Sequence, residues 1–125
     1  MIILKLFNLF NKNIEDDIFD NSKLIFHNNY LIVGTEYNCR KKPNMIRSDV
    51  IKKTTINTPV HIEQFIYDNV PAYMIVNSKN NCDLGVLSRG AACSVSTYFN
   101  KGNTIIKLTE KFKNSFHVDI KIYSR

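Results

Sequence analysis

Short apolar segments separated by polar turns constrain the fold of this chain more than any other feature of its sequence. Residues 117–123 alternate between polar and apolar, which places Val118, Ile120 and Ile122 on one face and is the pattern of a half-buried β-strand. Residues 60–63 alternate in the same way. Runs of β-branched and other apolar residues predict further strands at 30–33, 72–77, 84–87 and 104–108.

Helical signals mark one internal segment of the chain. Ser88 is a suitable N-cap, and the helix predicted over 91–99 ends at a turn that contains Gly102. Residues 39–53 are polar and basic and are expected to form a long loop or a loosely paired hairpin. Several short strands without regular strand–helix alternation predict a mostly β fold of the α+β class, a small, curled OB- or SH3-like β-barrel with one or two helices.

The first twenty residues follow a different pattern. Apolar side chains at 2, 3, 6, 7, 9 and 10 have helical spacing, and those at 14, 18 and 19 continue it. We therefore predict an N-terminal helical extension over residues 1–28 and a β-barrel domain over 29–125. The polar face of the extension is acidic, which disfavours a membrane-surface anchor. It favours packing against the domain, a protein partner or a second copy through residues 1–20.

The apolar start of the chain is too short for a membrane span. Residues 1–10 are interrupted at Lys5 and Asn8, whereas a spanning helix needs roughly 20 apolar residues. The basic start and the small-residue cleavage site of a secretory signal are also missing. We therefore expect a cytoplasmic protein with no membrane association.

Residue patterns for catalysis, metal binding or a cofactor are missing from the sequence. The histidines are far apart, the cysteines form no Cys-x-x-Cys pair, and the glycines lie singly rather than in a phosphate-binding loop. We therefore predict a non-catalytic binding module that holds no metal and no cofactor, rather than an enzyme. The isolated histidines are His27, His61 and His117. The cysteines, which we expect to be reduced thiols, are Cys39, Cys82 and Cys93.

Positive charge is concentrated in two blocks. The formal net charge is +6; residues 40–62 carry six basic side chains against one acidic, and residues 101–125 carry six against two. Such blocks meet the minimal requirement for a partner that carries phosphates, although solvated Lys and Arg side chains on any surface give the same counts. Gathered on one side, they can form a groove that follows a nucleic-acid backbone.

A series of short motifs runs through the predicted domain. They are a Val-Gly pair followed by an aromatic at 33–37, a strand with an acidic residue at 60–63, a strand that begins with alanine at 72–76, a Gly-x-Leu with a following basic residue at 85–89, and a loop aromatic at 114–116. Their order and spacing, over about residues 31–125, resemble the HIRAN domain family. The loop between the second and third motifs lacks the Asn-Pro pair that is usual in that family.

The resemblance implies a modified OB-like β-barrel that holds the 3′ end of single-stranded DNA. In the family, aromatic side chains stack on the terminal bases, and a loop aspartate contacts the terminal hydroxyl group. Carried over by position, the resemblance implies stacking for Tyr37 and Phe116 and a phosphate contact for Arg89.

The position of the hydroxyl-binding residue depends on how the loop is aligned. Spacing without gaps places Asn69 on it, whereas a shift of one residue keeps a Tyr67–Asp68 pair. Our leading hypothesis is a non-catalytic nucleic-acid-binding module for single-stranded DNA or DNA 3′ ends. The alternative is a protein-interaction or oligomerisation module that uses the apolar helix of residues 1–20 and has no nucleic-acid role. The predicted binding residues are Tyr37, Arg40, Lys41, Lys42, Tyr67, Asp68, Arg89 and Phe116.

Overall fold

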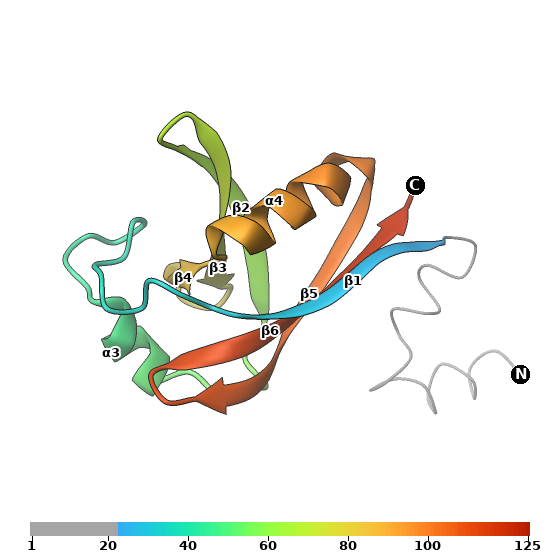
Figure 1. Cartoon of the computed structure of the whole chain (residues 1–125). Coiled ribbons are helices and arrows are strands. Elements are labelled where there is room, and N and C mark those ends of the chain that lie inside the picture. Colours follow the sequence, from blue (N-terminus) through green and yellow to red (C-terminus); the bar gives the residue numbers. More distant parts are fainter. Residues whose placement is uncertain (1–22) are drawn as a thin grey trace, which may run out of the picture.

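The computed structural model describes residues 23–125, which form two three-stranded antiparallel sheets and two α-helices (Figure 1). The first sheet has the strand order β1-β6-β5 and the second β2-β3-β4. The mostly β prediction is therefore confirmed. The elements are β1 (Leu24–Leu31), α3 (Arg47–Lys52), β2 (Val60–Tyr67), β3 (Val70–Asn77), β4 (Cys82–Val86), α4 (Arg89–Tyr98), the 3₁₀ turn η1 (Phe99–Lys101), β5 (Gly102–Phe112) and β6 (Ser115–Ser124).

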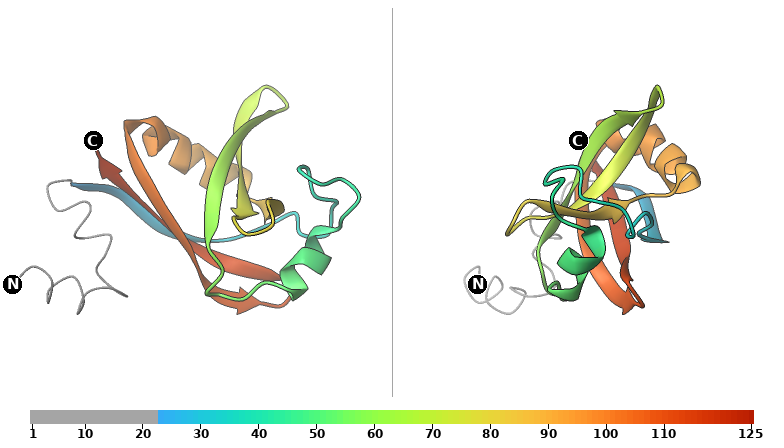
Figure 2. Two further views of the ribbon diagram at one scale, coloured as in Figure 1. Left: turned by 180° about the vertical axis from the view of Figure 1, so that it is seen from behind. Right: turned by 90° about the vertical axis from the view of Figure 1, so that its left-hand side faces the viewer.

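The two sheets do not close into the predicted barrel. On one side an isolated antiparallel bridge joins Val33 to Val86. A Cβ on Gly85 would lie 2.6 Å from the carbonyl oxygen of Val33, so glycine permits this close approach. On the other side, β2 and β5 are not joined by a ladder of hydrogen bonds. An open cleft of about 320 Å³ lies between these two strands and is lined by Ile62 of β2 and Ile106 of β5, among others. The views in Figure 2 show the two sheets crossing one another.

The shared core lies between the sheets. Val118, Ile120 and Ile122 are fully buried, which confirms the inward face predicted for the last strand. Helix α4 packs against β3 and β1 (Figure 1). Its first turn is capped as predicted, because Ser88 Oγ accepts a hydrogen bond from the backbone N–H of Ala91 at 3.3 Å.

Residues 64–71 form a β-hairpin where the sequence analysis expected a loop. Strand β2 continues to Tyr67, β3 begins at Val70, and the two strands pair from end to end. The turn between them is made by Asp68 and Asn69, both with positive φ, at 54° and 66°. Asn and Asp tolerate this left-handed conformation, which matches the twist of a two-residue hairpin.

Residues 39–53 also differ from the expected loop or hairpin. The first half closes at an isolated bridge between Asn38 and Ile46, but the second half contains α3. This short polar segment is held as a helix because the side chains of Val50 and Ile51 are buried in the core.

The predicted helices of residues 1–20 lie outside the described residues. Strand β1 begins at Leu24 and pairs with β6 along its length. Residues 24–28, which the sequence analysis assigned to the helical extension, therefore belong to the first sheet. Within residues 23–125, no helix has the length and apolar character that a membrane crossing requires.

Candidate functional site

A buried carboxylate anchors the first basic block to the second sheet. Asp83 on β4 is fully buried, and its carboxylate accepts hydrogen bonds from the backbone N–H groups of Arg40 and Lys41, each at 2.9 Å. It also pairs with the guanidinium of Arg47, whose Nε lies 2.8 Å from Oδ2. Arg47 in turn donates to the carbonyl oxygen of Gly34 at 2.9 Å. These contacts fix the basic loop, which we define as residues 38–46, at both of its ends.

The ionisation of Asp83 is set by the same contacts. Burial alone would raise its pKa, but the N–H groups of Lys41 and Arg40 and the charge of Arg47 outweigh burial and lower the pKa below its ordinary value. Asp83 is therefore an anion at neutral pH. The Cys39 thiol beside it has a raised pKa, chiefly because of burial and then because of the Asp83 charge.

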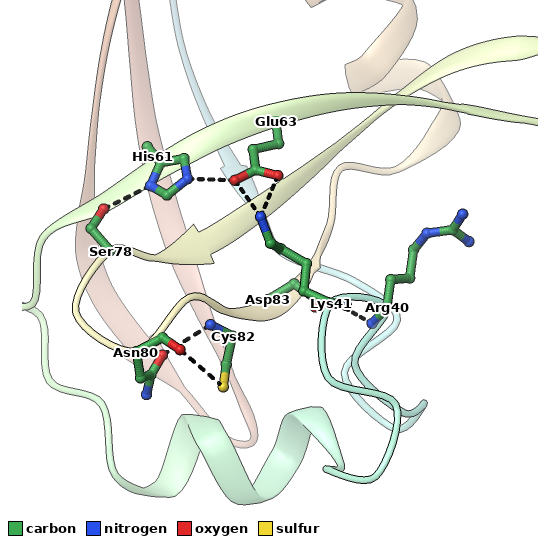
Figure 3. A network of polar contacts seen from close by, with 8 residues as sticks. All are labelled: Arg40, Lys41, His61, Glu63, Ser78, Asn80, Cys82 and Asp83. Carbon is green, nitrogen blue, oxygen red and sulfur yellow. Dashed lines mark hydrogen bonds and ion pairs between the residues drawn. The ribbon is translucent and has the colours of Figure 1, made fainter.

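A second acidic residue binds a side chain of the basic loop. The ammonium of Lys41 lies 2.8 Å from both carboxylate oxygens of Glu63 on β2. His61 Nε2 lies 2.6 Å from the same carboxylate, and His61 Nδ1 lies 2.8 Å from Ser78 Oγ. Hydrogen bonds from Lys41 first, and then from His61, lower the pKa of Glu63. Figure 3 shows this chain of contacts beside the Asp83 anchor.

Ser78, His61 and Glu63 have the order of a nucleophile, a base and an orienting acid. Glu63 is, however, held by Lys41 as well as by His61. The ammonium competes with His61 for the carboxylate and weakens the support that a general base draws from its acid. We therefore interpret the series as a clamp on the basic loop. Within residues 23–125, no group of three or more His, Cys, Asp or Glu side chains is placed to hold a metal ion.

The other two cations of the basic loop contact strand β2 and the turn between β3 and β4. Lys42 Nζ donates to the carbonyl oxygen of Asn80 at 2.8 Å. The guanidinium carbon of Arg40 lies 4.3 Å from the centre of the Phe65 ring, a cation–π arrangement. A guanidinium stacked in this way keeps N–H donors at its rim for a phosphate.

One exposed aromatic side chain lies near this cation, and a second belongs to the segment before the basic loop. Tyr67 is 61% exposed and follows Phe65 by two positions on β2, so both rings are on the strand face that Arg40 covers. Tyr37 is 63% exposed and belongs to the segment that leads into the basic loop. We call Arg40, Phe65 and Tyr67 the stacking surface; Tyr37 is a separate predicted stacking residue, directly before the basic loop.

The remaining predicted residues divide between this region and others. Asp68 is exposed in the hairpin turn next to Tyr67, and Arg89 is exposed as the first residue of α4. Phe116 is fully buried in the core, so the prediction that its ring stacks on a base is wrong. The sequence contained a signal for this burial, because Phe116 is in phase with the inward residues Val118 and Ile120 of the same strand.

Three residues of the site were missed by sequence reasoning. Arg47 was counted only among the six basic residues of 40–62, and Asp83 was not singled out as a site residue, yet both are buried. Phe65 was treated as part of a loop, whereas it forms the platform under Arg40. The pairing of Arg47 with Asp83 joins residues 36 positions apart and leaves no local pattern.

Comparison of the chain with known protein families, with characterised proteins and with solved structures found no match. The resemblance to the HIRAN family therefore stays a prediction.

Proposed function

We propose that this chain is a non-catalytic nucleic-acid-binding module that binds single-stranded DNA, with DNA 3′ ends as the preferred form. The observation that carries the proposal is the guanidinium of Arg40 stacked on Phe65 beside the exposed ring of Tyr67. A cation next to an exposed aromatic ring offers one partner for a phosphate and one for the adjoining base. Two such partners suit a nucleotide whose base is not already stacked in a duplex.

The charge of the chain supports the same function. The formal net charge is +6, and the basic loop carries three cations in succession, of which Arg40 is the one that stacks on Phe65. The Asp83 anchor fixes the backbone of this loop, so less conformational freedom is lost when its side chains bind a phosphate. The two crossed sheets are also compatible with the OB-like arrangement that the HIRAN resemblance implies.

The hairpin turn offers an acceptor for a terminal hydroxyl group. Asp68 and Asn69 are both exposed there, directly after Tyr67. In this proposal Tyr67 stacks on the last base, while the carboxylate of Asp68 or the amide oxygen of Asn69 accepts a hydrogen bond from the 3′ hydroxyl group.

The affinity for labelled single-stranded DNA is expected to fall steeply with salt. Each phosphate neutralised by the basic residues contributes about −0.7 to the slope of log affinity against log salt, so four phosphates give a slope of about −3. Fluorescence anisotropy between about 50 mM and about 200 mM salt measures this slope. Absence of binding at the lower salt concentration overturns the proposed function. Equal affinity for free and blocked 3′ ends leaves strand binding and removes the end preference.

Removal of the Glu63 charge is expected to strengthen binding. In Glu63→Gln the ammonium of Lys41 loses its anionic partner, both of whose oxygens lie 2.8 Å away. A released cation near the stacking surface adds roughly one phosphate contact and makes the salt slope more negative by about 0.7. Asp49→Asn is the matched control, because it removes a carboxylate that is 61% exposed and pairs with Lys52 on α3 at 3.9 Å rather than with a cation of the basic loop. An unchanged slope in Glu63→Gln, or an equal change in both variants, contradicts a role for Lys41 in phosphate binding.

A further inference from the structure

The outer end of the β2–β3 hairpin carries exposed apolar side chains on both of its faces. Ile66 is 63% exposed, Tyr67 61% and Val70 41%. Cross-strand pairing places Tyr67 opposite Val70 and Ile66 opposite Pro71, and successive residues of a strand point to opposite faces. The tip is therefore a narrow ribbon with an aromatic face and an aliphatic face.

Within residues 23–125, the fold leaves this ribbon uncovered. Figures 1 and 2 show the end of the hairpin projecting beyond helix α4 and the body of the two sheets. The turn residues Asp68 and Asn69 at its end are also exposed. Exposed apolar residues gathered on a projecting element mark a binding element rather than core.

The charges around the tip indicate what it contacts. Residues 64–71 contain no Lys or Arg, and the turn carries the carboxylate of Asp68. The aromatic face carries a cation further back, because Arg40 lies over Phe65, two residues before Tyr67. A ligand that presents apolar groups to the tip and negative charge to Arg40 fits this arrangement. A nucleic-acid strand is such a ligand, because its bases can contact the tip while its phosphates contact Arg40.

We propose that the tip of the β2–β3 hairpin is a wedge that recognises the junction between single-stranded and double-stranded nucleic acid. This inference rests on the proposed function and names its substrate. At a junction, the terminal base pair of the duplex takes the place that the last base of a free strand occupies on Tyr67 and Val70, and Ile66 and Pro71 on the opposite face separate the second strand. The single strand continues along the Arg40–Phe65 platform. Apolar side chains act in this way at base steps that proteins unstack.

The experiment compares three fluorescent DNA ligands with equal numbers of phosphates: a single strand, a blunt duplex, and a duplex with a single-stranded 3′ overhang. We expect the overhang ligand to bind about tenfold more tightly than the single strand, because the wedge adds one base-stacking contact. A 2-aminopurine base in the terminal pair is expected to change its fluorescence when the protein binds, because its stacking neighbour changes.

Ile66→Asn is expected to abolish the tenfold preference while binding of the single strand persists. Its matched control is Ile56→Asn, since Ile56 is also an exposed isoleucine, at 47%, but lies outside the hairpin and the basic loop. Val70→Asn is a second tip variant, and thermal unfolding of each variant establishes that it is folded.

The outcomes separate this inference from the function on which it rests. Equal affinities for the overhang and the single strand overturn the wedge and leave strand binding intact. Failure to bind any of the three ligands at low salt overturns both proposals. If Ile66→Asn lowers the mass of the free protein in sedimentation and keeps the preference for the overhang, the tip is a self-association surface and the wedge is wrong.

Discussion

Replacement of Asp83 by asparagine is expected to lower the free energy of unfolding by about 3–5 kcal/mol, the cost of removing one partner of a buried ion pair. The variant leaves the buried guanidinium of Arg47 without its counter-charge. It also replaces one of the two oxygens that accept the N–H groups of Arg40 and Lys41 by an amide nitrogen, which cannot accept them. Denaturant unfolding followed by circular dichroism measures the change.

The surface pair between Asp49 and Lys52 provides the control for Asp83. Their side chains are 61% and 72% exposed, so Asp49→Asn is expected to cost no more than about 0.5 kcal/mol. If Asp83→Asn costs as little as Asp49→Asn, the anchor of the basic loop does not contribute to the stability of the fold.

The effect of Asp83 depends on pH in a defined direction. Its folded pKa is lowered, whereas an aspartate in the unfolded chain has a pKa of about 3.9. The stabilisation by its charge is therefore present above about pH 4 and is lost as the pH falls through the lower, folded pKa. We expect the difference between the wild type and Asp83→Asn to be constant near neutral pH and to shrink in acid.

The double variant Tyr37→Ala/Tyr67→Ala is expected to lose about 2–6 kcal/mol of binding free energy for single-stranded DNA, since each base–aromatic stack is worth about 1–3 kcal/mol. Both rings are more than half exposed, so little stability is lost with them. Fluorescence anisotropy at one fixed salt concentration measures the loss, which corresponds to at least about thirtyfold in affinity. The salt slope is expected to stay the same, because no charge has been removed.

Phe112→Ala is the matched control for the stacking surface. Phe112 is an exposed aromatic, at 43%, with the ammonium of Lys113 at 5.4 Å from its ring centre, but it lies at the β5–β6 turn. If Phe112→Ala weakens binding as much as the double variant, the interface is at the β5–β6 turn rather than at the basic loop.

Local sequence patterns predicted most of the strands and the main helix. Polar and apolar residues alternate at 117–123 and 60–63 because successive side chains of any strand point to opposite faces. This alternation is visible in the sequence without knowledge of the fold. Ser88 was recognisable as an N-cap for the same reason, because its hydrogen bond to Ala91 is made within one turn.

Elements with a weak period were predicted less well. Helix α3 has only six residues, and it is held by the burial of Val50 and Ile51 rather than by its own helical tendency. The hairpin of 64–71 was taken for a loop, although Asp68 and Asn69 are residues that a two-residue turn accepts. The apolar run at 65–66 is too short to predict by itself that β2 continues to Tyr67, because its pairing with β3 is not visible in the sequence.

The candidate site required the tertiary structure, because its contacts join distant parts of the chain. Sequence alone determined that the chain is β-rich, that its cations are clustered and that Tyr37 and Tyr67 are candidates for stacking. Only the folded structure decided that Asp83 is buried under the basic loop, that Arg40 lies on Phe65, and that the ring of Phe116 is enclosed. The physical reason is that strand and helix periods are local properties of the backbone. Burial and charge pairing instead depend on which segments the packing of the two sheets brings together.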